Sequence, residues 1–444
     1  MKKLEYFLLV MIFLCASCAK DQWFDPPLKG PGNNNSPYNL ICPQIKIAVV
    51  SDIHFMAPAL MPDDINNADF QKKMKADRKL IELSDPIFKE VISELIAEKP
   101  DILLIPGDLS FEGEKLSHEI VSDLLQELEN KGIKVYVIPG NNDINNPDAK
   151  DYSGDVTVPT ENVGPDDFAE IYEAFGYTGD EIIARDGNSL SYICEPYEGL
   201  WILGIDANEI VTENGQKKYK IAESTRDWIL DKIKDVSNKN ITVLAMMHYG
   251  VIAHYSEQKK LEPLLYKADE LASALMNAGI RIILTGHYHA NDIVNFMDGG
   301  KILYDIQTGS LVTPPYSYRI MKLDDNFINI DSRMVTNVES ALTSEMDFLS
   351  YSDVTLTSRI NGFFTKYGGA LIKVYGIPAG DYPDVVPFLT KAYKAYFGGD
   401  ERLNPEERKN IGVLAESVPS SLTIINSFWT DLPPKDNKIH IKLK

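Results

Sequence analysis

The sequence predicts an α/β fold, in which strands are covered by helices on both faces, followed by a mainly helical C-terminal domain. Between residues 44 and 334, short apolar stretches rich in β-branched residues repeatedly end in a polar or glycine turn, and helical patterns often follow them. Fully apolar strands that alternate with helices are typical of a sheet buried on both faces. After residue 334 the pattern changes to longer helical stretches with Gly-Gly terminators. We therefore predict a catalytic-type α/β domain over 44–334 and a helical domain over 335–444.

The N-terminus has the pattern of an export signal followed by a tether. Two lysines precede a short apolar run, and small residues then lead to Cys18. This run is shorter than the roughly 20 residues that span a bilayer, so a transmembrane anchor is disfavoured. The stretch "FLCASCAKD" resembles a bacterial lipoprotein signal over residues 1–18, which implies lipidation of Cys18. Residues 19–43, rich in Pro, Gly and Asn, predict a tether. We expect an exported protein that a lipid anchor holds in the bacterial cell envelope, at the periplasmic or the cell-surface face.

Charge and cysteine content limit the possible partners. A formal net charge of -21 at pH 7 disfavours binding to a nucleic-acid polymer, which depends on Lys and Arg neutralising phosphates. A small anionic substrate stays possible if metal ions supply local positive charge. Nothing in the sequence indicates a protein partner. Cys42 and Cys194 either form a disulfide in an oxidising compartment or remain two separate thiols.

The five predicted strands each end in side chains that can bind metals. Alone, an Asp in such a place is often a helix cap, and a lone His is often a core residue. Five strand ends together favour a site, because ligands of open α/β sheets bind beyond the carboxyl ends of the strands. In chain order the side chains are Asp52 and His54, Asp108, then Asn141, Asn142 and Asp143, then His248, and finally His287 and His289.

The chemistry of these side chains indicates the class of metal. They offer carboxylate, imidazole and amide oxygen but no thiolate, a set that suits Mn, Fe or Zn. Their number exceeds what one ion needs. Two divalent ions about 3.5–4 Å apart would use them all, and such a pair stabilises the attacking and leaving oxygens of a phosphoryl displacement.

The motifs D-x-H, G-D, G-N-x-D, a lone H and G-H-x-H, over residues 46–310, resemble the calcineurin-like metallophosphoesterases. The resemblance implies a two-sheet sandwich flanked by helices, with a dinuclear centre and a metal-bound hydroxide as nucleophile. Glycines in the tight turns after the strands would let the backbone come close to the metals. It implies that the first ion is held by Asp52, His54 and His289, that Asp108 bridges both ions, and that the second is held by Asn141, His248 and His287. In "GDLSFE" the tyrosine of the purple acid phosphatases is missing, so a ferric centre is not expected.

A narrower resemblance is to bacterial exported cyclic-nucleotide phosphodiesterases of the same superfamily. It rests on "GDLSFEGEKLSHE", "PGNNDINNP" and "FGYTGDE…SLSY", together with the C-terminal extension. The resemblance implies a substrate among small phosphate esters, in particular phosphodiesters such as 3′,5′-cyclic nucleotides. Aromatic residues after residue 360 could form a lid over the substrate, although a small helical core is favoured.

Asn142 departs from the family pattern, in which a His proposed to protonate the leaving oxygen precedes an acidic residue that orients it. Asparagine cannot deliver a proton at neutral pH. Loss of a general acid typically costs about 10²–10⁴ in rate, or about 3–5 kcal/mol. Three interpretations follow. The protein is a slow or leaving-group-selective phosphodiesterase in which Asn142 and Asp143 remain at the site, or another histidine replaces the missing acid, with His254 favoured over His118. In the third interpretation it is a metal-bearing pseudoenzyme that binds a ligand or partner without turnover.

Overall fold

The computed structural model describes most of the chain from residue 44 onward. The described residues are 44–64, 67–75, 77–213, 216–236, 239, 241–262, 264–324, 326–338 and 346–443. The predicted signal, the tether, Cys18 and Cys42 lie outside them, so lipidation and the Cys42–Cys194 pairing stay predictions. Cys194 itself is fully buried. No helix among the described residues is long and apolar enough to cross a membrane.

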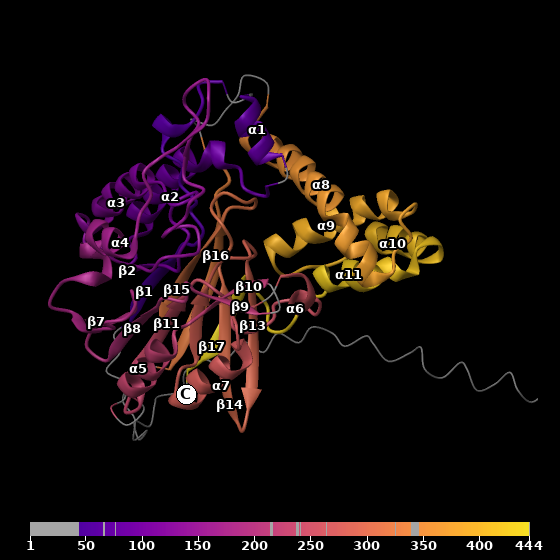
Figure 1. Ribbon diagram of the computed structural model, residues 1–444. Coiled ribbons are helices and arrows are strands. Elements are labelled where there is room, and N and C mark those ends of the chain that lie inside the picture. Colours follow the sequence, from indigo (N-terminus) through magenta and orange to yellow (C-terminus); the bar gives the residue numbers. More distant parts are fainter. Residues whose placement is uncertain are drawn as a thin grey trace, which may run out of the picture. The chain divides into compact units, whose positions relative to one another are not determined.

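Two mixed sheets form the centre of the fold (Figure 1). The six-stranded sheet has the order β17 (Lys438–Lys442), β16 (Phe327–Met334), β15 (Ser317–Leu323), β1 (Ile45–Val49), β2 (Ile102–Ile105) and β3 (Lys134–Val137). The seven-stranded sheet has the order β13 (Asp292–Asp298), β14 (Lys301–Gln307), β12 (Ile282–Thr285), β11 (Thr242–Met247), β8 (Leu200–Ile205), β7 (Tyr192–Tyr197) and β6 (Ile182–Arg185). Within them, β1, β2 and β3 run parallel to one another, as do β8, β11, β12 and β14. All five predicted ligand-bearing strands (β1, β2, β3, β11 and β12) therefore have at least one parallel neighbour, although β1 also pairs antiparallel with β15 and β3 lies at the edge of its sheet.

The alternation of side chains along β11 explains why this sheet is covered on both faces. Leu244 and Met246 belong to the large cluster that also contains residues of β1 and β2, whereas Ala245 and Met247 belong to a second cluster. Successive side chains of a strand point to opposite faces, so one face packs toward the other sheet and the other packs against helices. The second cluster is completed by apolar residues of α5 (Glu223–Ile233) and α7 (Ala268–Ala278).

The helices that follow the first two strands cover the six-stranded sheet. In α2 (Ser84–Glu98), Ile87, Val91 and Leu95 recur every four residues and are buried, which is the spacing of one helix face. α3 (Lys115–Glu129) packs against α2 and β3. The remaining elements before residue 334 are α1 (Ala68–Met74), β4 (Lys150–Asp151), β5 (Val158–Pro159), α4 (Pro165–Ile171), β9 (Glu209–Glu213), β10 (Gln216–Lys220) and α6 (Gln258–Leu261).

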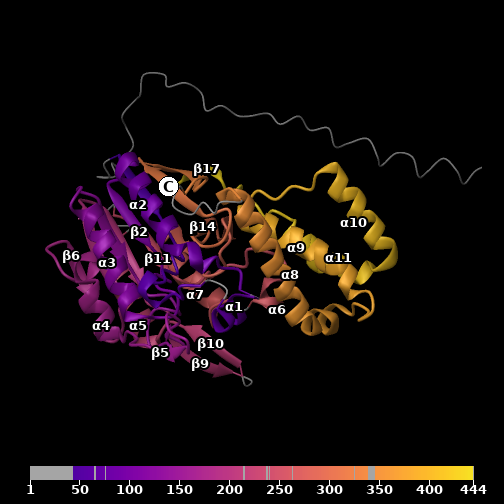
Figure 2. The same cartoon turned by 90° about the horizontal axis from the view of Figure 1, so that it is seen from above.

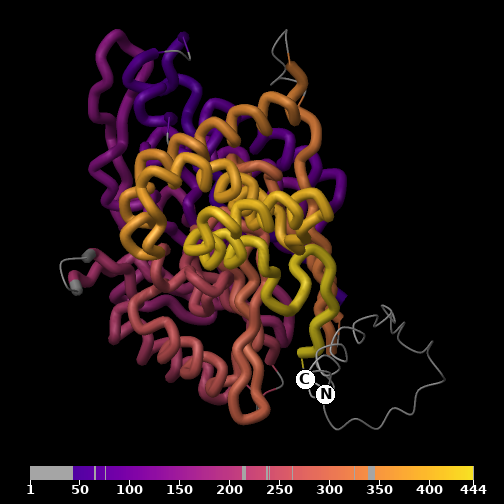
Figure 3. The backbone as a smooth tube through the Cα atoms, turned by 90° about the vertical axis from the view of Figure 1, so that its right-hand side faces the viewer, coloured from indigo at the N-terminus to yellow at the C-terminus, as the bar shows by residue number. Residues whose placement is uncertain are grey.

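The C-terminal region is helical, and its last segment returns to the sheet. Helices α8 (Phe348–Tyr375), α9 (Tyr382–Gly398), α10 (Pro405–Ser417) and α11 (Leu422–Phe428) group together, away from α2 and α3 (Figure 2). After them β17 pairs antiparallel with β16, with Lys438 opposite Asp331 (Figure 3). The structure thus confirms the predicted α/β fold with an added helical region, and it adds a strand to the segment predicted as mainly helical.

Candidate metal centre

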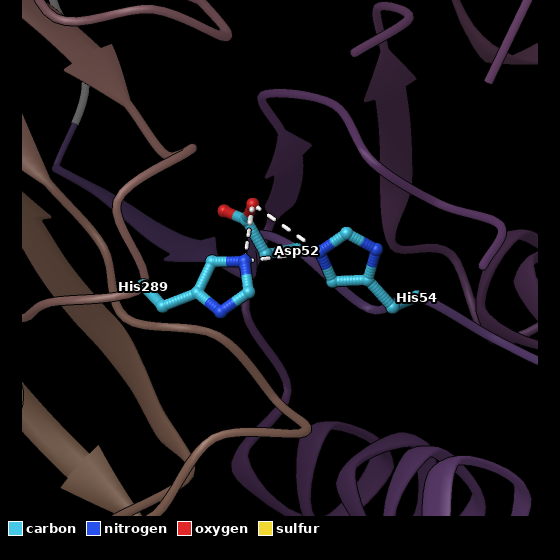
Figure 4. Close-up of side chains that lie close together, drawn as sticks. All are labelled: Asp52, His54 and His289. Carbon is cyan, nitrogen blue, oxygen red and sulfur yellow. Dashed lines mark hydrogen bonds and ion pairs between the residues drawn. The ribbon is translucent and has the colours of Figure 1, made fainter. Parts of the chain in front are cut away.

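Three predicted ligands from β1 and β12 converge on one point. Asp52 and His54 follow β1, and His289 follows β12; their rings and carboxylate face one another (Figure 4). The Nε2 atoms of His54 and His289 lie 3.1 Å apart. Asp52 Oδ1 lies 3.7 Å from His54 Nε2 and 3.5 Å from His289 Nε2. All three side chains are buried, and one ligand atom from each lies within 4.8 Å of the others.

A second group forms beside the first, from the ends of β2, β3, β11 and β12. His248 Nε2 lies 3.2 Å from Asp108 Oδ2, 3.3 Å from His287 Nδ1 and 3.2 Å from Asn141 Oδ1. Asp108 Oδ2 also lies 3.6 Å from His54 Nε2, a member of the first group. Asp108 therefore stands between the two groups, where a carboxylate that bridges two ions would have to be.

The backbone at these strand ends is strained. Asp52, His54, Asp108, His287 and His289 have φ values of 50°, 44°, 52°, 74° and 64°, in the left-handed region that non-glycine residues rarely adopt. Each such residue costs on the order of 1–3 kcal/mol, and such residues cluster at functional sites. Two glycines allow the turns to approach: a Cβ at Gly140 would collide with the Asp108 carboxylate, and one at Gly286 with Ser51 and Asp52.

Hydrogen bonds behind the ligands orient their metal-facing atoms. His248 Nδ1 donates to the Pro106 carbonyl at 2.9 Å, so in the neutral imidazole that binds a metal the lone pair is on Nε2, the atom that faces the site. His289 Nδ1 lies 2.9 Å from Thr313 Oγ1. Asp52 accepts hydrogen bonds from Ser51 Oγ at 2.7 Å and from the His287 backbone N–H at 3.0 Å. Such partners fix the tautomer and ring orientation of metal ligands in general.

The charges of the ligand cluster are also suited to binding cations. Burial disfavours a charged His248, but the Asp108 carboxylate outweighs burial and raises the pKa of His248 to about 9. Burial raises the pKa of Asp52 to about 6 and lowers the pKa of both His54 and His287 to about 3. The cluster thus combines the neutral imidazoles of His54 and His287 with buried carboxylates whose ionised form needs a positive neighbour, a role that protonated His248 takes in the absence of ions. Divalent ions supply that charge, and the donor set of nitrogen and oxygen matches the one expected from the sequence.

Asn142 contacts the bridging carboxylate. Its backbone N–H donates to Asp108 Oδ1 at 2.9 Å, and its side-chain Nδ2 donates to Asp108 Oδ2 at 2.7 Å. Asp143 is fully buried, and its carboxylate accepts from the backbone N–H groups of Gly140 and Ser110 at 2.8 Å and 2.9 Å. Asn142 is therefore a positioning residue for Asp108, and Asp143 holds the turn that presents it.

The two histidines weighed as substitute acids lie in other surroundings. His254 is buried and places Nδ1 2.6 Å from Asp292 Oδ1, with Nε2 3.5 Å from Asp305 Oδ1. His118 is buried against Tyr172, with Nδ1 2.8 Å from the phenol oxygen. Neither is among the residues that line the cavity at the metal centre. The loop after His248 directs His254 toward β13, so the geometry gives it a place in a buried ion-pair network.

A cavity of about 400 Å³ opens onto both ligand groups, and part of its lining was missed by the sequence analysis. The missed residues are basic or aromatic: Lys73 from α1, Arg78 and Lys79 from the segment between α1 and α2, and Lys366 and Tyr367 from α8. Phe363, also from α8, is one of the aromatic residues for which a lid was considered. The dense basic pattern of "KKMKADRK" was the one sequence signal that could have indicated the first three.

The family model described as calcineurin-like phosphoesterase matches residues 45–291. Among solved structures, a dimetal phosphatase from Danio rerio is similar, with 13% identity and a TM-score of 0.45, over 65% of this chain and 96% of that one. A purple acid phosphatase from yellow lupin has 12% identity and a TM-score of 0.42, over 67% and 53%. A putative 5′-nucleotidase from Staphylococcus aureus has 13% identity and a TM-score of 0.38, over 72% and 59%.

No curated protein matches the chain. The family match covers more than half of the chain and spans every predicted metal ligand, from Asp52 to His289. The chain belongs to the calcineurin-like phosphoesterase family, whose members are generally metal-dependent hydrolases of phosphate esters.

Proposed function

We propose that the protein hydrolyses small phosphodiesters that carry an aromatic group, 3′,5′-cyclic nucleotides among them, at a rate that depends strongly on the leaving group. The observation that carries this proposal is that metal-ligating, basic and aromatic side chains together line one cavity. Its volume of about 400 Å³ is within the range of small-molecule sites, roughly 300–1,000 Å³.

The basic side chains give the cavity a charge opposite to that of the whole chain. Lys73, Arg78, Lys79 and Lys366 line it, while the formal net charge of the chain is -21. Some of this charge is already paired, since Arg78 Nη1 lies 3.0 Å from Glu262 Oε1 and Lys79 Nζ lies 3.7 Å from Asp77 Oδ2. A phosphate group that enters competes for these side chains, and arginine in particular binds phosphate with two parallel hydrogen bonds.

The aromatic side chains supply a surface for a planar group. Phe363 and Tyr367 lie one helical turn apart on α8, with ring centroids 5.0 Å apart, and Tyr367 is 48% exposed. Lys366 Nζ lies 4.9 Å from the centroid of the Tyr367 ring. Stacking of a base on such a ring is worth about 1–3 kcal/mol and tolerates different bases.

A second cavity adjoins the first, and its presence supports a phosphodiester rather than a phosphomonoester as the substrate. It has a volume of about 320 Å³ and shares Arg78 and His287 with the first. Its lining includes Tyr219 and Tyr249. A phosphodiester carries two substituents on phosphorus, and each of the two cavities would accept one of them.

When bound, two divalent ions would activate water and stabilise the negative charge on the attacking and leaving oxygens. The chain's own residues hold those ions in position, and Asn142 keeps Asp108 oriented through two hydrogen bonds. Because Asn142 cannot protonate the leaving oxygen, esters whose leaving group is stable as an anion should react fastest.

The test compares the wild-type protein with Asn142→His on bis-p-nitrophenyl phosphate and on 3′,5′-cyclic AMP, after loading with Mn²⁺. We expect the wild type to cleave the activated diester readily and the cyclic nucleotide slowly. The variant should gain at least about 10-fold on the cyclic nucleotide, a fraction of the usual effect of a general acid, and little on the activated diester.

Asp108→Asn is the matched control, because it keeps the shape of the side chain and removes the charge that both ligand groups share. Its turnover should fall to background, and this result would show that the activity of the wild-type preparation does not come from a contaminating phosphatase. If the wild type cleaves neither ester with Mn, Zn, Fe or Mg, the proposal is wrong and a protein that binds its ligand without turnover takes its place.

We also propose that the protein works outside the cytoplasm, attached to the envelope through a lipid on Cys18. The support is the sequence of residues 1–18. Radiolabelled palmitate should enter the wild-type protein in bacterial cells and not the Cys18→Ser variant. Equal labelling of both would contradict lipidation at this residue.

A further inference from the structure

A second group of acidic side chains lies where the helical region meets the seven-stranded sheet. Asp292 begins β13, Asp400 and Glu401 follow α9, and Asp431 and Asp436 lie between α11 and β17. One oxygen each from Asp292, Glu401 and Asp436 lies within 4.8 Å of the others, and the same holds for Asp400, Asp431 and Asp436. None of the five lines the cavity at the dinuclear centre.

Glu401 shows that this is more than an acidic patch. Its side chain is only 7% exposed, and both of its carboxylate oxygens are buried without a hydrogen-bond partner. It points into the cluster, since one of its oxygens lies within 4.8 Å of oxygens of Asp292 and Asp436. Asp431 Oδ1 is a further buried oxygen without a partner. Buried carboxylates are normally paired or bound to a metal, because leaving one unsatisfied is costly.

The neighbouring groups do not compensate this charge. His254 is engaged with Asp292 at 2.6 Å, and Arg319, fully buried, donates to the carbonyl oxygens of Asp436 and Gln307, both at 2.6 Å. The Asp436 carboxylate accepts from the backbone N–H groups of Ile293 and Asp400, at 2.7 Å and 2.6 Å. These bonds leave Glu401 with carboxylates as its charged neighbours at closest range.

A proton on Glu401 is the simplest alternative to a cation. Burial, together with the charges of Asp292 and Asp436, raises the pKa of Glu401 to about 10. A protonated carboxyl group would donate a hydrogen bond to an acceptor nearby, yet neither oxygen of Glu401 has a hydrogen-bond partner. One oxygen of Glu401 instead lies within 4.8 Å of an oxygen of each of two other acids, a spacing that fits ligands around one ion.

We propose that Asp292, Glu401 and Asp436, with Asp400 and Asp431, bind a hard divalent cation of the Ca²⁺ class. The donors are oxygen atoms alone, which selects against Zn and Cu. Ca²⁺ takes 6–8 oxygens from carboxylates in flexible geometry, whereas Mg²⁺ usually keeps most of its water and binds only one or two carboxylates. The ion would join β13, the loop after α9 and the segment before β17, and would thereby fasten the helical region to the sheet.

The experiment measures the melting temperature (Tm) and the heat of binding when CaCl₂ is added to the full chain, already loaded with Mn²⁺ at the dinuclear centre. In CaCl₂ at about 1 mM, the range of extracellular Ca²⁺ modules, each chain should bind one metal ion more than in calcium-free buffer that contains Mn²⁺. The Tm of the wild type should rise by about 3 °C or more, because the ion binds the folded chain only.

Glu401→Gln is the deciding variant. Without Ca²⁺ the folded wild type has to take up a proton on Glu401 or keep a buried charge, and glutamine avoids both at constant shape. In calcium-free buffer with Mn²⁺ its Tm should therefore lie above that of the wild type, and CaCl₂ should add nothing. Asp436→Asn should lose the Ca²⁺ response as well. Glu416→Gln, an exposed position on α10, is the matched control and should respond like the wild type.

Two outcomes would overturn the proposal. One is a wild type whose Tm and Ca²⁺ stoichiometry do not change with CaCl₂, and the other is a Glu401→Gln variant that binds Ca²⁺ as the wild type does. Asp108→Asn separates this site from the dinuclear centre, because it should lose hydrolysis and keep the full response to CaCl₂.

Discussion

Asn142 shows how one side chain can change its task while the site around it is kept. Its amide group donates to the carboxylate that both ligand groups share, at 2.7 Å. The residue therefore helps to hold the metal site, even though it cannot deliver a proton. Metal binding, which Asn142 supports, is therefore distinct from protonation of the leaving group, which it cannot perform, and each can be measured independently.

Asn142→Ala should weaken metal binding rather than substrate binding. The variant keeps the backbone hydrogen bond to Asp108 and loses the side-chain one, and loss of such a partner typically costs about 10–100-fold in metal affinity or activity. The Mn²⁺ concentration that gives half of the maximal activity should rise accordingly. Asn188→Ala, in an exposed loop near Asp186, serves as the control. An unchanged Mn²⁺ dependence would exclude a positioning role for Asn142.

Glu114→Gln should stabilise the protein at neutral and alkaline pH but not in acid. Burial raises the pKa of Glu114 from 4.5 to about 7, so the folded chain keeps a proton that the unfolded chain has released. Between these values the unfolded state binds fewer protons, and stability falls as the pH rises from about 4.5 to about 7. Glutamine avoids this loss while its oxygen can still accept from the Glu112 backbone N–H. Urea unfolding at pH 8 should show a gain on the order of 2–3 kcal/mol.

At pH 5 the same comparison should show little difference, because Glu114 is then mostly neutral in the folded chain. Glu119→Gln, exposed on α3, is the control and should not change the free energy of unfolding at either pH. A gain that is equal at pH 5 and pH 8 would mean that packing, and not ionisation, causes it.

At the scale of elements, the strand ends explain what the sequence could reveal. Asp52, Asp108 and His248 each follow directly on a buried strand, so the local pattern identified both the strand and the ligand. The parallel pairing of β1 with β2, and of β11 with β12, then brings these ends together. The lining from α8 could not be found in this way, because only tertiary packing brings a helix from the C-terminal region to the metal centre.

His254 illustrates the opposite case. It is the sixth residue after His248, and this spacing favoured a place at the same site. The loop instead turns it toward Asp292, where an ion pair at 2.6 Å holds it. Short separation in sequence limits distance but does not fix direction, which a loop decides through contacts that lie far away in the chain.

Helix α8 should determine affinity for the base of a nucleotide and leave affinity for phosphate unchanged. In Phe363→Ala and Tyr367→Ala, the inhibition constant of 5′-AMP should rise by about 10-fold, the size of one lost stacking contact. The inhibition constant of inorganic phosphate should stay as in the wild type. Leu349→Ala, 50% exposed on the same helix, is the control. If both constants rise together, the helix acts on the site by its position and not by stacking.

At the scale of the whole molecule, the metal centre should also be a source of stability. Five ligand residues have positive φ values, and two buried carboxylates lie close together, so the ion-free site is strained. Bound ions offset this cost, by about 2.7 kcal/mol at a free concentration of 100 times Kd. The Tm in Mn²⁺ should therefore exceed the Tm in EDTA by several degrees.

Two variants identify the origin of that shift. Asp108→Asn should lose most of the Mn²⁺ response, since both ligand groups share this carboxylate, whereas Glu401→Gln should keep it. A response that Asp108→Asn retains in full would place the stabilising ion somewhere other than the dinuclear centre.

The pairing of β17 with β16 has a consequence for how such a chain could have arisen. Because Lys438 lies opposite Asp331, the helices between these strands leave the sheet and return to it at neighbouring points. In topology they are an elaborated hairpin turn, and lengthening a turn costs only about 0.6 kcal/mol for each doubling of its length. A short turn between the two strands could thus have been extended into the helical region without disturbing the ligand-bearing strands. The scaffold and the selectivity of such a protein could then diversify separately, through exchange of the segment between residues 335 and 437.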